Sequence, residues 1–169
     1  MARASVSLVT EKSNVVNLLT DPFAFFGALG HFSLPLYWSD TTSSWVPLSK
    51  VDSVKVFKAV WVFMDPEKPE KPAYIVGTLT GPRVTEYGEA TFVSYSFKGD
   101  DGENGLDINV KVTGDGRETV VEADFEVQSK KSFWGSILRK VSVGDDAGAH
   151  LLNDHLIPYL NKYVSRRVV

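Results

Sequence analysis

The chain of 169 residues contains no cysteine. This absence excludes disulfide frameworks, thiolate metal sites and cysteine nucleophiles, and it fits a reducing compartment, so we expect a cytoplasmic protein. Histidine is also scarce, with three in the whole chain. So few imidazoles leave little material for a metal centre, and we expect no metal and no cofactor.

Long hydrophobic runs are missing as well. No apolar stretch approaches the roughly 18–20 residues of a membrane-spanning helix. The first ten residues alternate and are too short for a signal peptide. Neither sign of charge dominates, since 21 acidic residues face 18 basic ones and the net charge is −3. We therefore expect no nucleic-acid partner.

Aromatic residues are abundant, at 12% of the chain, within a composition that is 43% hydrophobic and 23% charged. This composition is that of a globular protein, and a chain of this length normally forms one domain that buries about 70% of its extended surface. We expect a single domain over residues 1–169, with enough surface buried for a substantial core or for a core plus a cavity.

The first thirty residues predict a strand and two short helices. Apolar and polar residues alternate over 4–9, as in a strand with one buried face. Thr10 is expected to cap a helix whose apolar residues lie at 15–19. Asp21-Pro22 predicts the start of a second helix, because Asp accepts from free backbone N–H groups and Pro fits the first helical turn. Gly30 is expected to end it.

Alternation then predicts strands over 53–64, 73–80, 83–98, 106–113 and 119–128. The strand over 83–98 is expected to bend near Gly88. Residues 65–72 hold three prolines and predict a stiff turn, and Pro35 and Pro47 argue for an edge or irregular course between 31 and 50. Residues 151–163 carry an apolar stripe at helical spacing, which Pro158 should kink or deprive of a backbone bond.

Helices do not alternate with strands, so a parallel doubly wound sheet is excluded. We predict an α+β fold with a curved, mostly antiparallel sheet of about six to seven strands wrapped around a long C-terminal helix. The order of elements, and the segment Leu18-Leu19-Thr20-Asp21-Pro22 between the short helices, resemble the START-like, or SRPBCC, helix-grip superfamily. The resemblance extends to an uncharacterised archaeal branch of it. It implies a hydrophobic cavity for a small apolar ligand between sheet and helix.

We therefore expect carriage or sensing of a hydrophobic small molecule or lipid. The residues expected to line its cavity are Phe57, Trp61, Ile75, Tyr95, Ile108, Val110, Val121, Phe125, Leu152, His155, Leu156 and Tyr159. The alternative that these aromatics simply fill the core stays open. An enzyme of the polyketide cyclase or aromatase kind is a second hypothesis, which needs converging polar groups inside the cavity. No catalytic residue is identified by any motif.

The histidines allow more than one interpretation. His155 lies on the apolar stripe and can anchor the polar end of a ligand. His150 and Asp154 are four residues apart, which predicts a surface ion pair on one helical face. A zinc site there would need His31 as a third ligand and an open position, and we do not expect one.

A basic and aromatic segment offers a further hypothesis. It contains Lys130, Lys131, Phe133, Trp134, Arg139 and Lys140. As a short amphipathic helix it would place Trp and Phe among lipid headgroups and its cations on anionic lipid. Such a protein would be a membrane-associating accessory. The alternative is that the segment covers the cavity mouth, and a role in binding a protein partner also stays open.

Overall fold

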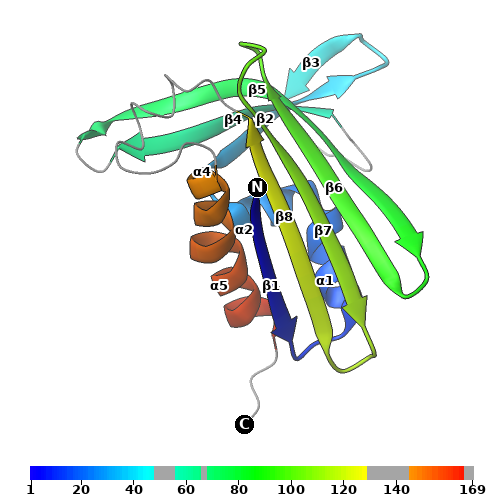
Figure 1. Cartoon of the computed structure of the whole chain (residues 1–169). Coiled ribbons are helices and arrows are strands. Elements are labelled where there is room, and N and C mark those ends of the chain that lie inside the picture. Colours follow the sequence, from blue (N-terminus) through cyan, green and yellow to red (C-terminus); the bar gives the residue numbers. More distant parts are fainter. Residues whose placement is uncertain (48–55, 66–67, 129–144, 166–169) are drawn as a thin grey trace.

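The computed structural model describes residues 1–47, 56–65, 68–128 and 145–165. Its elements are β1 (Ala2–Leu8), α1 (Lys12–Thr20), α2 (Pro22–Leu29), β2 (Phe32–Ser39), β3 (Ser44–Pro47), β4 (Val56–Asp65), β5 (Lys68–Tyr87), β6 (Ala90–Gly99), β7 (Gly105–Gly114), β8 (Thr119–Gln128), α4 (Asp145–His150), the π-helix η1 (Leu151–Leu156), α5 (Ile157–Tyr159) and the π-helix η2 (Leu160–Val164). The last four form one continuous helical run, the terminal helix (Figure 1).

The described strands form a single antiparallel sheet in the order β1-β8-β7-β6-β5-β4-β2-β3. The α+β class, the large antiparallel sheet and the C-terminal helix are confirmed. The strand number is not, because the sheet has eight strands instead of six to seven. The difference lies in β2 and β3, a hairpin whose prolines obscured its alternation. Both prolines are tolerated because β3 is an edge strand and the ladder between β2 and β4 is irregular around Pro35.

The prediction of one strand over 83–98 is wrong. Gly88, at φ +61°, occupies the left-handed region and allows a tight hairpin in which Tyr87 pairs with Ala90. Gly81-Pro82, the gap between the strands predicted over 73–80 and 83–98, is instead an irregularity inside β5, where the register with β6 shifts. Figure 1 shows β5 running through both parts of the bent sheet. Part of the expected turn over 65–72 also belongs to strands, since Asp65 pairs with Lys68.

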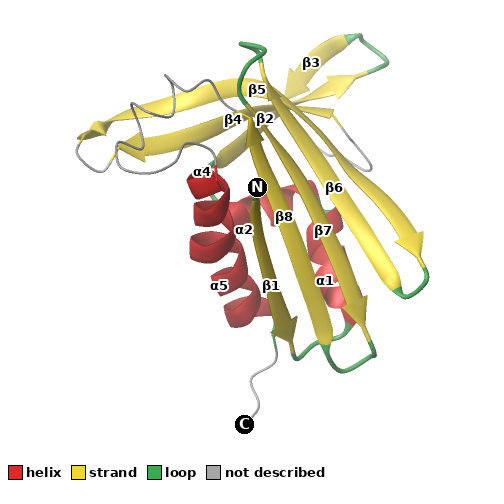
Figure 2. Cartoon of the chain, viewed as in Figure 1, coloured by secondary structure: helices red, strands yellow, loops and turns green. Residues whose placement is uncertain are grey.

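All the described helices cover one face of the sheet (Figure 2). Asp21 caps α2 as predicted, accepting from the backbone N–H groups of Phe23 and Ala24, and Gly30 ends that helix at φ +65°. The prediction for Thr10 is wrong, because α1 has Glu11 as its N-cap residue. Thr10 is buried instead, and its carbonyl accepts from the Thr119 hydroxyl at 2.8 Å.

The core lies between this face and the helices. The terminal helix buries four leucines, Leu151, Leu152, Leu156 and Leu160, and each is worth roughly 1.5–3 kcal/mol when fully removed from water. The helix departs from α geometry around Pro158, which has no N–H to donate. Ile157 N–H bonds to Leu152 C=O, five residues back. No helix within the described residues is long and apolar enough to cross a membrane.

Candidate metal centre

All three histidines of the chain meet at one corner of the molecule. His31 lies between α2 and β2, His150 ends α4, and His155 lies in η1. Their Nε2 atoms form a triangle with all three sides at 3.1 Å. The ring planes are inclined to one another by 72–84°, so the three rings meet edge to face around a shared point.

The dimensions of this triangle match a zinc site. Tetrahedral Zn²⁺ with Zn–N bonds of about 2.0–2.1 Å requires ligand nitrogens about 3.3–3.4 Å apart. The observed 3.1 Å is shorter by only a few tenths of an ångström. An ion at bonding distance from all three nitrogens would lie about 1 Å from their plane, with its fourth bond directed away from it.

The π-helix places two of these histidines. His150 and His155 are five residues apart. In an α-helix, which turns about 100° per residue, side chains at that spacing point about 140° away from each other. The wider turn of η1, with hydrogen bonds five residues back, brings both rings to the same side. Such π segments are rare and occur often at functional sites.

The backbone at His31 is strained. His31 has a φ of +61°, unusual for a residue with a side chain, and the Phe32 N–H bonds to the Gly30 carbonyl at 2.7 Å across it. The neighbouring strand holds this turn, because Val62 N–H donates to the His31 carbonyl at 2.6 Å. The His31 ring reaches the same residue, with Nδ1 2.9 Å from the Val62 carbonyl oxygen. Backbone strain of this kind is concentrated at functional sites.

The partners of the Nδ1 atoms decide what the Nε2 atoms can do. A carbonyl oxygen only accepts, so Nδ1 of His31 donates to Val62, and Nε2 of the neutral ring is then a lone pair. In the same way Nδ1 of His150 donates to the Asp154 carboxylate at 2.7 Å, which leaves a second lone pair. Two lone pairs 3.1 Å apart repel each other unless a hydrogen atom or a metal ion lies between them. Nε2 of His155, 3.1 Å from both, can donate that hydrogen as a neutral ring, and a metal ion can take its place.

His155, which is half-buried, completes the triangle. Burial, together with the neighbouring His31 and His150, lowers the pKa of His155, while the Asp154 carboxylate opposes the shift. The direction favours the neutral, metal-binding form of this imidazole. Gly30 lies against the ring, and a Cβ there would be 3.6 Å from Nδ1. His31 and His150 in turn have the outer partners that orient zinc-bound imidazoles, a carbonyl and a carboxylate.

The predicted ion pair between His150 and Asp154 is present on the surface. The sequence indicated His31 as the third ligand that a zinc site would need, and the structure places it in the cluster. His155 was predicted to anchor the polar end of an apolar ligand, and its five-residue spacing from His150 would give the two no shared face in an α-helix. The expectation of no metal stays a prediction, and the structure brings the three histidines close enough together to hold an ion.

The residues predicted to line an apolar cavity gather in one place. Ten of the twelve belong to a single buried cluster: Phe57, Trp61, Ile75, Tyr95, Ile108, Val110, Val121, Phe125, Leu152 and Leu156. Each is at most 4% exposed. His155 and Tyr159 are half-buried. The hydroxyl of Tyr95 already has a partner, since it donates to the Leu19 carbonyl at 2.6 Å. Burial, and to a lesser extent the Asp21 carboxylate, raise the pKa of Tyr95.

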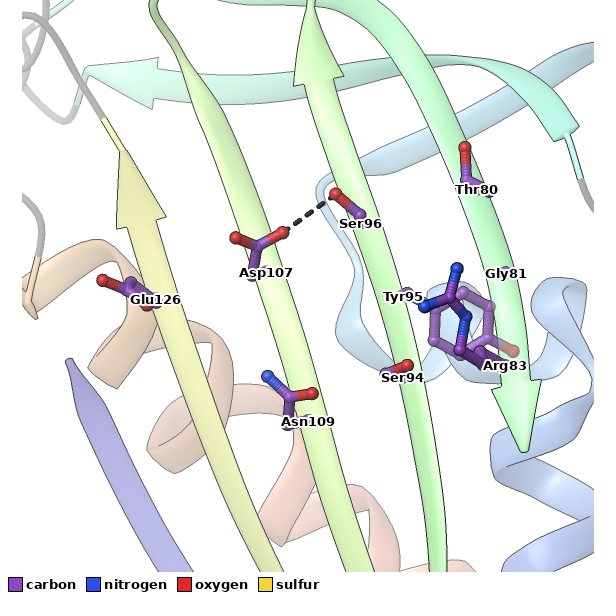
Figure 3. Close-up of a pocket in the computed structure, with 9 residues that line it drawn as sticks. All are labelled: Thr80, Gly81, Arg83, Ser94, Tyr95, Ser96, Asp107, Asn109 and Glu126. Carbon is purple, nitrogen blue, oxygen red and sulfur yellow. Dashed lines mark hydrogen bonds between the residues drawn. The ribbon is translucent and has the colours of Figure 1, made fainter. Parts of the chain in front are cut away.

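Three pockets among the described residues lie away from this buried cluster. One of about 250 Å³ opens on the sheet face away from the helices, and Figure 3 shows Ser94, Ser96, Asp107 and Asn109 side by side along β6 and β7. Ser96 donates to Asp107 at 2.8 Å. Two more are lined by β1 and β6–β8, and by residues beside the β1–α1 connection. None of these three is lined by both the sheet and the terminal helix.

The predicted membrane-contact residues, Lys130, Lys131, Phe133, Trp134, Arg139 and Lys140, lie outside the described residues.

Comparison with known proteins supplies no family. No family model matches the chain, and no curated protein matches it. Among solved structures, the crystal structure of TTHA0849 from Thermus thermophilus is similar, with a TM-score of 0.49 and 12% sequence identity over 90% of this chain and 91% of that one.

Proposed function

We propose that this protein binds one divalent transition metal ion, with Zn²⁺ the foremost candidate, through Nε2 of His31, His150 and His155. The observation that carries the proposal is the triangle of three nitrogens with 3.1 Å sides. Strain at His31 and the π turn of η1 support it, because each costs local stability and each is needed to bring a ligand into place.

The donor set predicts which metals bind. Neutral imidazoles suit Zn²⁺, Cu²⁺, Ni²⁺ and Co²⁺, whereas Mg²⁺ and Ca²⁺ prefer oxygen ligands. The chain has no thiolate that would select softer ions. We expect tight binding of one Zn²⁺ or Co²⁺ per chain and no detectable competition from Mg²⁺ at cellular concentrations.

The test is metal content and titration. Protein purified without an affinity tag that binds metal is analysed by mass spectrometry of its metals, then stripped with a chelator and titrated with Zn²⁺ by calorimetry. We expect one site per chain. His150→Gln is the first variant, since this exposed side chain contributes little to packing. His31→Asn is the second, because Asn tolerates a positive φ and can still donate to Val62.

Each histidine variant should weaken Zn²⁺ binding by at least tenfold. Asn153→Ala is the matched control, an exposed position on η1 between two of the ligands, and it should bind as the parent does. Equal affinity of the parent and of a variant lacking all three histidines would contradict the proposal. So would folded protein that takes up no Zn²⁺ at neutral pH, because protons alone would then fill the triangle.

The helix-grip assignment and the apolar-ligand hypothesis stay predictions. The apolar inner face of the sheet, covered by the terminal helix, supports them. The close burial of the predicted lining residues limits them, because a ligand of any size would have to displace side chains that now fill the interior. Organic extraction of freshly purified protein followed by mass spectrometry tests this hypothesis. A lipid recovered in stoichiometric amount would support it, and an empty extract would favour the packed core.

A cyclase-like enzyme and a membrane-associating accessory also stay hypotheses. The first needs two or more polar groups converging in an apolar cavity. The second is tested by sedimentation with anionic vesicles at low salt, where Phe133→Ala combined with Trp134→Ala should abolish binding.

A further inference from the structure

The metal site proposed above has three protein ligands, and what occupies the fourth position determines its chemistry. Structural zinc sites are closed by four protein ligands, whereas catalytic sites have three and leave one position for water or substrate. All the histidines of the chain are already in the triangle, and no cysteine exists to close it. A fourth protein ligand would therefore have to be an oxygen donor.

The Asp154 carboxylate contacts the histidine cluster, and its place is already fixed. Its Oδ2 atom lies 2.7 Å from Nδ1 of His150, on the opposite side of the ring from Nε2. A carboxylate held there orients the imidazole and cannot bind the ion that the same ring coordinates. Among the described residues, the group able to hold a metal contains the three histidines and no acidic residue.

The cluster is open to water on the side of His150. The His150 side chain is 47% exposed and that of Asp154 is 64% exposed. Three neutral imidazoles do not offset the ion's charge, so a bound divalent metal keeps a net charge of about +2 at a solvent-accessible position. Such an ion attracts an anionic ligand that can bind through a single oxygen or nitrogen.

We infer that the fourth coordination position is exchangeable and takes water or a small monodentate anion, such as a carboxylate, from solution. This inference rests on the proposed metal binding. It assigns the site to Lewis-acid chemistry on an external oxygen ligand instead of to a closed structural role. Binding is ligand exchange only: the anion donates a lone pair to the metal, one water leaves, and no covalent bond of the protein changes.

The experiment uses the full chain loaded with Co²⁺, whose visible absorption reports its coordination. The loaded protein is titrated with sodium azide and, separately, with acetate. We expect a saturable shift of the visible bands that fits one anion per metal ion. Stripping the metal with a chelator should abolish the shift, and Asn153→Ala should reproduce the parent's behaviour.

Asp154→Asn separates the orienting role from that of a fourth ligand. If Asp154 only orients His150, the variant should bind Co²⁺ more weakly, by about 10–100-fold, and keep the same spectrum and anion response once loaded. A changed Co²⁺ spectrum in the saturated variant would make Asp154 a ligand and overturn the inference. Bound Co²⁺ whose spectrum does not respond to either anion would overturn it too. Failure to take up Co²⁺ at all would instead refute the proposed function, so the two failures are distinguishable.

Discussion

The sheet core and the histidine corner of this protein differ in how far their local backbone geometry follows ordinary preferences. In the core, fully buried Phe57, Trp61 and Phe125 lie on regular strands, and Tyr95 satisfies its buried hydroxyl on the Leu19 carbonyl. At the corner, a residue with a side chain adopts a left-handed backbone, a helix widens its turn, and like groups converge. Local preference and global fold agree in the first region and conflict in the second. Conflicts of that kind are expected where a protein binds something.

The largest expected effect on stability comes from truncating a buried side chain of the core. Phe125→Ala removes a ring that is fully buried, and we expect a loss of about 3–5 kcal/mol in the free energy of unfolding, measured by urea denaturation. Phe92→Ala, at an exposed position on the outer face of β6, is the control and should cost under about 1 kcal/mol. Comparable losses in the two variants would mean that the core is not the more tightly packed region.

Metal should stabilise the corner by a smaller amount. At a free Zn²⁺ concentration 100 times the dissociation constant, binding to the folded state alone adds about 2.7 kcal/mol, which raises the melting temperature by roughly 5–10 °C. Thermal unfolding with Zn²⁺ and with chelator measures the difference. His150→Gln should lose most of it. A rise of the same size in that variant would place the stabilising site elsewhere.

Gly27 and Gly30 allow the energetic cost of the unusual backbone just before His31 to be measured. Gly27 is exposed inside α2, and a Cβ added there would meet no atom within 4 Å, so it should tolerate Ala with a gain of about 0.5–1 kcal/mol. Gly30→Ala should cost about 1–3 kcal/mol, because Gly30 combines φ +65° with ψ −171°, a backbone region essentially restricted to glycine, although a Cβ there has room beside His155. Urea denaturation of both variants gives the comparison, and a neutral Gly30→Ala would show that the turn before His31 is not held.

The smallest effect is a pH dependence of the metal-free protein. Because the pKa of His155 is lowered in the folded state, the unfolded chain binds more protons over an interval below about pH 6.5. Stability should therefore fall as the pH is lowered through 6.5 towards the folded-state pKa, and level off below it. Urea denaturation in chelator at several pH values measures this slope. His155→Gln should remove the part of the slope that comes from His155. An unchanged slope in this variant would contradict a lowered pKa of His155 in the folded state.

The sequence predicts the sheet and its neighbouring helices better than it predicts the histidine corner. Alternation over 106–113 and 119–128 found β7 and β8, and Asp21-Pro22 and Gly30 gave the limits of α2, because in these segments short-range preferences and the final fold agree. The hairpin at Gly88 was misplaced, since one glycine inside an alternating run is compatible with a bend or a turn.

The corner could be predicted only in part. The pair of His150 and Asp154 follows from ordinary helical spacing and was found. The pair of His150 and His155 depends on a π turn, and the approach of His31 depends on a contact with Val62 that spans 31 residues. Neither leaves a periodic signal in the sequence. Three-dimensional packing decides both.

The contacts of His31 with His150 and His155 span 119 and 124 residues of the chain. A metal ion held between them would join the turn at residue 31 to the helix that carries residues 150 and 155, in a chain that has no cysteine to cross-link them. The site cannot form until synthesis has passed residue 155, because two of its three ligands lie so far along the chain from the first. Ion capture would therefore report that the helix carrying His150 and His155 has been made and has docked. Truncated chains that end before residue 150 would carry no such mark.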